Sequence, residues 1–394
     1  MDAMSLMNYL AEIAVSESAI SDLNKGKIWR KINRHPGKMQ TPFEKLLDRD
    51  GWKEIPKSTM IREFFITLDE GKLEKGFLHF ASKNPFSHDG SKIVARACYF
   101  KLWELINNPS ASENTLITGG PSLGKAFFLY FVMWKLSLEG KSFVYSKHGT
   151  NEFYLLHEGK AYMKLRCLSS CGVLSRKEMW FLVDNHRPLP CSARTLMVSS
   201  LGREAFKAFE RRDPIVKYYM PVWTFEECLF LYETLHAQNL SKSEFEERFS
   251  LCGGVPRHLF DDFNETQRNI NRALCHVNMS HMKKCLTLLL GDSNESLHKL
   301  FLLNVCTEDK EVSVKESWVL ARLKRRAKAF KFLTVSFCSE KVGNMVFEAL
   351  YRQDRLELVE TLKVESNSIH SSIGNFPLGF LNEKLSAIQT AGRQ

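Results

Sequence analysis

Between residues 114 and 263, short and almost continuously apolar segments alternate with longer segments that carry a helical pattern. Four of the short segments are predicted to be buried strands, at 114–118, 141–146, 178–184 and 194–200. Apolar strands that alternate with helices are typical of a parallel sheet covered on both faces. We therefore expect an α/β domain at 111–263 with a parallel sheet core, and a hairpin turned at Glu158–Gly159.

The rest of the chain is expected to be mostly helical. Residues 1–45 are predicted to be an N-terminal arm, and 46–110 a helical lead-in region whose segment 91–106 has apolar residues at helical spacing. After residue 254 the pattern becomes helical, so 264–394 is expected to be a mainly helical C-terminal region, or a diverged or truncated nuclease-like domain. Helices are expected in this part of the chain at 259–274, 281–290 and 295–305.

Composition leaves the class of partner open. The 394 residues carry a formal net charge of +10 and a pI of about 9.0, which favours a nucleotide, a nucleic acid or a membrane surface, although a mildly basic surface would look the same. None of the ten cysteines forms a CxxC pair, which indicates reduced thiols; Cys167 and Cys171 could ligate zinc, but no second pair follows. The N-terminus does not look like a cleaved signal peptide. No apolar run approaches ~18 residues, so no transmembrane helix is expected.

The strongest motif directly follows the first predicted strand. Residues 119–125 read Gly-Gly-Pro-Ser-Leu-Gly-Lys, which matches the phosphate-binding pattern GxxxxGK, and the motif opens a predicted helix. Glycines let backbone N–H groups converge on phosphate oxygens, and the helix N-terminus adds positive potential. Lys125 would reach the β- and γ-phosphates of ATP or a similar nucleotide. The expected phosphate-binding residues are Gly119, Gly120, Pro121, Ser122, Leu123, Gly124, Lys125 and Ala126.

Two positions depart from an efficient NTPase. Ala126 follows the lysine, where Ser or Thr normally gives a hydroxyl to Mg²⁺. The strand at 178–184 ends in Asp184, the candidate Mg²⁺ ligand and a candidate catalytic residue, although an ordinary strand-ending Asp would look the same. The next residue is Asn185, which can orient water but is not a base. The sequence therefore predicts nucleotide binding with weak or impaired hydrolysis.

Two further candidates follow along the chain. Ser199 and Ser200 end the next strand, and their hydroxyls could sense the γ-phosphate, but a helix N-cap is an equally good interpretation. Arg257 comes after Gly253–Gly254 at the start of a predicted helix. From there it could reach the nucleotide and stabilise transition-state charge, although a surface arginine after a turn is the plainer alternative.

Two other clusters raise the question of nucleic acid. A group of basic residues could form a nuclear-import signal or a DNA-binding patch, and a solvated helix face would give the same pattern. These residues are Arg322, Lys324, Arg325, Arg326, Lys328 and Lys331. His276, Asn278 and His281 lie close together in the sequence, as in some metal-dependent nucleases, but a helix surface is the simpler explanation.

Taken in order, these motifs resemble one known family. The segments LITGGPSLGKAFFLYFVMWKL, EMWFLVDN, RTLMVSSLGREAFKAF, YYMPVWTFEE and RFSLCGGVPRHLF are similar to the Crinkler effectors of oomycetes and chytrid fungi and to the retrotransposon-hot-spot proteins of trypanosomes. They lie within residues 90–263, and 343–348 adds a weaker match. The resemblance implies a STAND/AAA-like P-loop NTPase, with Lys125 as the phosphate lysine, Asp184 as the metal carboxylate and Arg257 as the sensor arginine.

The resemblance also implies a secreted virulence effector that acts inside the host cell, often in its nucleus, and perturbs host responses or provokes cell death. Family loops usually read GKS or GKT, so Ala126 departs from them, and the N-terminal translocation motif of the family is not visible in 1–60. We expect ATP or another NTP and Mg²⁺ as cofactors, and host DNA or a host nuclear protein as candidate partners. The alternatives are a DNA-damaging nuclease-type effector and a non-catalytic scaffold that binds a host protein.

Overall fold

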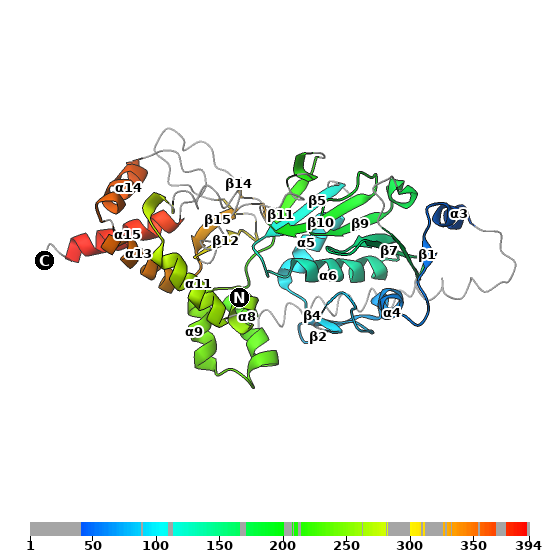
Figure 1. The fold of residues 1–394 in the computed structure, drawn as a ribbon, viewed down its shortest axis with the longest axis horizontal. Helices are drawn as coiled ribbons and strands as arrows, with labels where there is room; N and C mark the ends of the chain where they lie inside the picture. The colour runs from blue at the N-terminus through cyan, green and yellow to red at the C-terminus, as the bar shows by residue number, and fades with distance from the viewer. Residues whose placement is uncertain are drawn as a thin grey trace. The chain divides into compact units, whose positions relative to one another are not determined.

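Figure 1 shows the computed structural model of the chain, which divides into two compact units. The first comprises the described residues of Met1–Ile117, Gly124–Ser199 and Glu204–Lys217, and the second those of Thr118–Leu123, Ser200–Arg203 and Tyr218–Gln394. The structure describes residues 41–87, 90–108, 113–165, 171–200, 207, 209–211, 214–261, 263–280, 282, 300–308, 310–311, 326–327, 329–331, 333–353, 355–367 and 376–391.

The core of the fold is an eight-stranded sheet. In sheet order its strands are β1 (Lys53–Glu54), β8 (Lys160–Leu165), β7 (Glu152–His157), β6 (Phe143–Ser146), β9 (Trp180–Asp184), β10 (Arg194–Ser200), β5 (Asn114–Gly119) and β11 (Val216–Tyr219). β6, β9 and β10 are parallel to one another, whereas β7 and β8 pair antiparallel with each other, β7 also with β6, and β8 also with β1. The expected α/β class is confirmed, but the sheet is mixed, with a parallel centre and an antiparallel hairpin.

Three strands of this sheet end at the same edge. β9 and β10 run in parallel register, with Asp184 opposite Val198. The Thr195 N–H donates to the Glu113 carbonyl at 2.8 Å, which joins the beginnings of β10 and β5 and shows that these neighbouring strands run the same way. The segments that follow β5, β9 and β10 therefore leave the sheet at its carboxyl edge, where open α/β folds bind their ligands.

The hairpin expected around Glu158–Gly159 is confirmed. β7 and β8 pair with His157 opposite Lys160, so only two residues connect the strands. Both have positive φ, 46° at Glu158 and 71° at Gly159. Two left-handed residues in succession form the type I′ turn, whose twist matches that of the paired strands.

Strand alternation sends side chains to two cores, one on each face of the sheet. One face packs against α5 (Ala97–Asn107) and α6 (Lys125–Leu138), which lie together in Figure 1, and Trp103 of α5 contacts Trp180 of β9 with ring centroids 5.8 Å apart. The other face carries Val144, Phe181 and Val183 into a cluster with residues of α3 (Pro42–Arg49) and of the short helix η2 (Gly172–Ser175).

The lead-in region contains strands as well as helices. α4 (Met60–Ile66) and η1 (Leu68–Glu70) precede a three-stranded antiparallel sheet of β2 (Lys72–Glu74), β3 (Phe77–His79) and β4 (Lys92–Val94). The helix expected at 91–106 is confirmed from Ala97 onward as α5, but its first residues belong to β4. Strands of three residues are too short to show a period of two, which is why the pattern did not indicate them.

Helices make up much of the second unit. They are α8 (Phe225–Leu231), the π-helical turn η3 (Tyr232–His236), α9 (Lys242–Cys252), α10 (Pro256–Phe260), α11 (Phe263–Cys275), α13 (Glu340–Gln353), α14 (Arg355–Asn367) and α15 (Phe376–Ala391). The helix expected at 259–274 corresponds mainly to α11, and of the one expected at 281–290 only Met282 lies among the described residues. Over the described part of the chain, no helix combines the length and the apolar character needed to cross a bilayer.

The helix expected at 295–305 is wrong for its described second half. Phe301–Val305 forms strand β12, which pairs antiparallel with β15 (Leu333–Phe337) so that Phe301 lies opposite Phe337. β13 (Lys310–Glu311) and β14 (Arg326–Ala327) form another antiparallel pair. A short apolar run suits a strand or a buried helix equally, and the partner strand that decides lies far along the sequence. In the described part of 264–394 helices still predominate, and these two short strand pairs are added to them.

Candidate functional site

The turn between β5 and α6 has an unusual backbone conformation. φ is positive at Gly119 (155°), Ser122 (61°) and Gly124 (92°), and Gly124 precedes the first residue of α6. The Tyr99 hydroxyl donates to the Gly124 carbonyl at 2.7 Å, and a Cβ atom at position 124 would overlap with that hydroxyl. Position 124 therefore requires glycine, both for its dihedral angles and for its contact with Tyr99.

The turn leads directly into the first turn of α6. The Phe128 N–H donates to the Gly124 carbonyl at 3.0 Å, which begins the helical hydrogen bonding. Amides in the first turn of a helix have no acceptor within the helix, and together with the helix dipole they attract anions. Lys125 is the first residue of α6 and its side chain is buried, while Ala126 is half-buried and has no hydroxyl. The local geometry suits a phosphate group, and the assignment of these residues to phosphate binding stays a prediction.

Asp184 lies at the carboxyl edge of the same sheet. It is the last residue of β9, is half-buried, and pairs in register with Val198 of β10. Since β10 lies between β9 and β5, only one strand separates the candidate metal carboxylate from the strand that leads into the loop. The role of Asp184 as the metal carboxylate stays a prediction.

The two serines expected to sense phosphate lie on different faces of β10. Val198 is opposite Asp184 and shares its face, so alternation turns Ser199 to the opposite face and returns Ser200 to the face of Asp184. Ser199 is buried, and its hydroxyl donates to the Asn185 side-chain oxygen at 3.1 Å. Asn185 has a φ of 55°, and its N–H donates to the Val198 carbonyl at 2.8 Å. Of the pair, Ser200 is therefore the better candidate for contact with a nucleotide.

Sequence analysis missed a polar connection between the ends of β6 and β9. His186 Nδ1 lies 2.9 Å from the Asp184 carbonyl oxygen, and its Nε2 lies 3.0 Å from the Ser146 hydroxyl. A carbonyl only accepts, so Nδ1 carries a proton, and in the neutral imidazole Nε2 then accepts from the Ser146 hydroxyl. The imidazole therefore fixes the backbone at Asp184. No sequence motif links Ser146 to His186, because only the pairing of β6 with β9 brings them together.

A hydrated magnesium ion with a nucleotide fits these residues. Mg²⁺ usually binds through one or two carboxylates, waters and substrate phosphates, rather than in an all-protein cage. Asp184 can supply the carboxylate, and the turn around Gly124, where a side chain has no room, can supply backbone contacts to phosphate. Within the described ranges, no group of three or more His, Cys, Asp or Glu side chains is placed to hold a metal ion.

Arg257 belongs to the second unit. It is exposed on α10, and the two glycines before it are explained by packing within that unit. A Cβ at Gly254 would overlap with the Trp223 carbonyl, and one at Gly253 with the Cys338 carbonyl. The Trp223 N–H also donates to the Gly254 carbonyl at 3.0 Å. The GGVPR turn therefore has a structural reason, and the sensor role of Arg257 stays a prediction.

The candidate nucleic-acid residues are described only in part. Arg322, Lys324, Arg325, Lys328 and His281 lie outside the described residues. Arg326 is in β14 opposite Glu311, and Lys331 is exposed, with its ammonium 5.1 Å from the centroid of the Tyr218 ring. His276 and Asn278 are exposed after α11. The zinc candidate Cys167 is also outside the described residues, and Cys171 is a buried free thiol.

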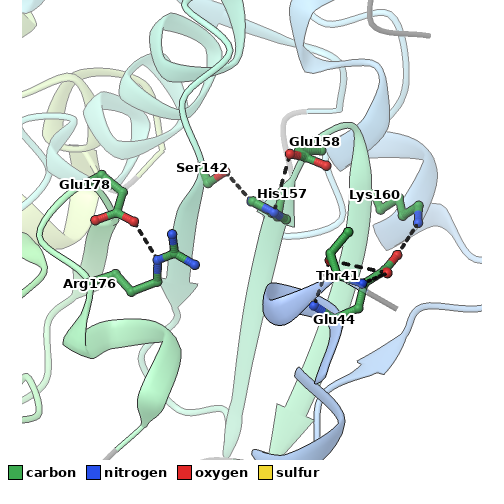
Figure 2. Close-up of polar contacts among 8 residues, drawn as sticks. All are labelled: Thr41, Glu44, Ser142, His157, Glu158, Lys160, Arg176 and Glu178. Atoms are coloured by element: carbon green, nitrogen blue, oxygen red, sulfur yellow. Dashed lines mark hydrogen bonds and ion pairs between the residues drawn. The ribbon is translucent and has the colours of Figure 1, made fainter. Parts of the chain in front are cut away.

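Figure 2 shows a second polar cluster, next to the β7–β8 hairpin. Ser142 Oγ lies 2.7 Å from His157 Nδ1, and His157 Nε2 lies 3.9 Å from Glu158 Oε1, an order that resembles a hydrolytic triad. However, the His157 ring packs against Phe43 in a tilted arrangement at a centroid distance of 3.8 Å, and the Glu158 side chain is largely exposed on a turn. Glu44 beside it forms the capping box of α3 with Thr41. We interpret the cluster as the anchor of α3 on the sheet.

Comparison with known proteins points to one group of effectors. No protein-family model matches the chain. Crinkler effector proteins 16 and 15 of Phytophthora infestans are each 27% identical to it over 233 residues, a match that covers 55% of this chain and 36% of each relative. The RuvB Holliday junction branch migration motor of Thermotoga maritima is 11% identical, with a TM-score of 0.25 over 52% of this chain and 67% of that one, a likeness too low to carry an argument. Over 55% of its length, this chain is therefore similar to Crinkler effector proteins, while it matches only about a third of their own length.

Proposed function

We propose that this chain is a Crinkler-like effector whose α/β domain binds a magnesium nucleotide, ATP or another NTP, and hydrolyses it only weakly. The observation that carries the proposal is the β5–α6 turn, where positive φ and the contact with Tyr99 leave room for glycine alone at position 124. Ser122 in the same turn has a φ of 61°, and a non-glycine residue in this region carries backbone strain that is commonly found at functional sites.

Each residue of the proposed site has a distinct task. The backbone N–H groups of residues 119–125, apart from Pro121, which has none, hold the phosphates, and the Lys125 ammonium binds their terminal oxygens. Asp184 orients the hydrated Mg²⁺, which when bound neutralises charge on the β- and γ-phosphates. Ser200 lies on the face of Asp184 and is the proposed contact to the terminal phosphate. Arg257 is the proposed sensor arginine, a role that rests on the resemblance to Crinkler effectors alone.

Weak hydrolysis is proposed because two groups needed for turnover are absent. Ala126 has no hydroxyl to ligate the metal. Asn185 is not a base, and its side chain accepts a hydrogen bond from Ser199, which lies on the opposite face of the sheet from Asp184. The side chain that follows Asp184 is therefore held away from the water that would attack a γ-phosphate. Nucleotide binding does not depend on either group, because it uses the backbone turn and Lys125.

The effector role is proposed from the similarity to the two Phytophthora infestans proteins. Both are named Crinkler effector proteins, and the match covers 36% of each. We propose that this chain acts inside a host cell, in the nucleus, and that the basic residues between 322 and 331 contribute to its import or to a contact with DNA or a nuclear protein. The bound nucleotide would then set the conformation in which it meets its host partner.

Titration with a fluorescent ATP analogue tests the nucleotide proposal. The full-length chain and its Lys125→Ala variant are compared with and without Mg²⁺. Loss of the ammonium should weaken binding at least about tenfold, which is typical of a lost hydrogen bond to a charged group. Lys160→Ala is the matched control, because Lys160 lies at the β7–β8 turn and pairs with Glu44 at 3.5 Å. Equal affinity of wild type and Lys125→Ala would refute the proposed function.

A further inference from the structure

The small sheet of β2, β3 and β4 carries three basic side chains in one row. Lys72 lies directly opposite His79, and His79 lies directly opposite Lys92. Residues that pair directly point to the same face of a sheet, and neighbouring strands lie about 4.8 Å apart. The three side chains therefore stand in a line that spans about 10 Å across the sheet.

The basic row lies on the outer face of this sheet. The next row along the strands is apolar and largely buried, and it consists of Leu73, Leu78 and Ile93. Alternation turns adjacent rows to opposite faces, so the apolar row forms the inner face and the basic row lies on the outer one. Lys72 and Lys92 are exposed, and His79 is half-buried. The two ammonium groups are therefore accessible to a partner.

The charge of the row is not compensated by the described acidic residues. In that part of the chain, neither Lys72 nor Lys92 forms an ion pair. The Lys92 ammonium lies over the neutral Phe77 ring, 4.9 Å from its centroid. Glu74 shares the outer face but stands opposite Phe77, at the other end of the strands. Like charges that pair directly destabilise a sheet, so an uncompensated row indicates that a partner supplies the negative charge.

Evenly spaced charges on one sheet face suit a phosphate backbone. A nucleic acid presents anions at regular intervals, and contacts to them depend on charge rather than on base sequence. A membrane surface would also require exposed apolar side chains beside the charges, whereas on this face Phe77 is buried and Val94 is half-buried. The formal net charge of +10 favours an anionic polymer as well.

We propose that the outer face of the β2–β4 sheet binds the phosphate backbone of a nucleic acid. The ammonium groups of Lys72 and Lys92 contact phosphate oxygens, and an imidazole N–H of His79 donates a hydrogen bond between them. This surface goes beyond the proposed function, because it uses neither the nucleotide site nor the basic residues between 322 and 331. Contacts of this kind hold a protein on nucleic acid without selecting a base sequence.

The test measures how the affinity of the full-length chain for duplex DNA depends on salt. Fluorescence anisotropy of a labelled duplex of about 20 base pairs gives dissociation constants between ~50 and ~200 mM KCl. Each phosphate contact contributes about 0.9 to the slope of log affinity against log salt, so Lys72→Gln/Lys92→Gln should reduce this slope by about 2. At the lowest salt the same variant should bind at least about tenfold more weakly, and equally so for duplexes of unrelated sequence.

A control variant separates the position of the charges from their number. Lys53→Gln/Lys57→Gln removes the same charge from exposed positions in and after β1, and it should keep the slope within about 0.5 of the wild-type value. Because repulsion along the row is removed, Lys72→Gln/Lys92→Gln should melt at or above the wild-type temperature. The inference would be overturned by an unchanged slope, an equal loss in the control or a lower melting temperature. A loss of affinity for poly-L-glutamate without a loss for the duplex would also overturn it, in favour of an acidic protein segment.

Discussion

Replacing Gly124 by alanine tests the turn on which the proposed site depends. Gly124 has a φ of 92°, which L-residues rarely adopt, and the space where its Cβ would lie is taken by the Tyr99 hydroxyl. That hydroxyl also donates to the carbonyl of Gly124 at 2.7 Å. The substitution therefore introduces both backbone strain and a steric overlap, and the overlap can be relieved only if Tyr99 moves away.

The two effects can be estimated separately. A non-glycine residue held in a sparsely populated region of φ and ψ costs about 1–3 kcal/mol. Displacing Tyr99 breaks a hydrogen bond whose net contribution to stability is about 1 kcal/mol. Gly124→Ala should therefore lower the free energy of unfolding by about 2–4 kcal/mol, the sum of both. Tyr99→Phe alone should lower it by about 1 kcal/mol.

A double-mutant cycle makes the reasoning refutable. In Tyr99→Phe/Gly124→Ala the backbone strain remains, but the steric overlap is relieved and the hydrogen bond is lost only once. The double variant should therefore be no less stable than Gly124→Ala. Its loss of stability should be about 1 kcal/mol smaller than the sum of the two single losses. Urea unfolding measures the four free energies, and titration with the ATP analogue should show weaker binding in both Gly124→Ala variants. Additive losses, or a Gly124→Ala protein within about 0.5 kcal/mol of wild type, would refute the account of this turn.

Two further outcomes are expected. Burial, the main cause, lowers the pKa of His157 below its ordinary 6.5, so the unfolded chain takes up a proton first and stability is lost as the pH falls from about 6.5 toward the lower native pKa. In thermal melts between pH 7.5 and 5, the melting temperature of His157→Gln should therefore fall less steeply with pH than that of wild type. Identical slopes would contradict this. His236, whose pKa is also lowered by burial, would account for part of the slope that remains. Ala126→Ser should raise Mg²⁺-dependent hydrolysis several-fold in a phosphate-release assay, because the restored hydroxyl can ligate the metal. An unchanged rate would mean that another group limits turnover.

The parts of the fold that could be predicted from sequence are those encoded locally. The β5 strand, the glycine-rich turn and the start of α6 are contiguous, so one motif with its flanking apolar segments was enough to place them. The hairpin at Glu158–Gly159 was visible for the same reason, because a two-residue turn selects residues that tolerate positive φ. In each case neighbours in sequence are also the neighbours that fix the conformation.

The parts that could not be predicted depend on pairing between distant segments. Phe301–Val305 is a strand only because Leu333–Phe337 pairs with it, and no window around residue 301 contains that information. The same is true of the site. The contact of Ser146 with His186 follows from the register of β6 with β9, and the separation of Ser199 from Ser200 follows from alternation along β10. Sequence motifs gave the candidate residues, whereas register decided which of them share a face.

The division of faces bears on how a bound nucleotide would be used. The face of Asp184 carries the first turn of α6, whose backbone N–H groups are suited to phosphate binding. Asn185, which follows Asp184, is not a base. Its side chain accepts a hydrogen bond from Ser199, which lies on the opposite face of the sheet from Asp184, so it is not directed to the face of Asp184. A hydroxyl restored at position 126 would improve metal binding without supplying a base, so hydrolysis should rise but remain slow. In the proposed function, slow hydrolysis leaves the nucleotide intact for as long as it stays bound, which favours a role in stabilising one conformation of the chain over a role in repeated energy-driven cycles.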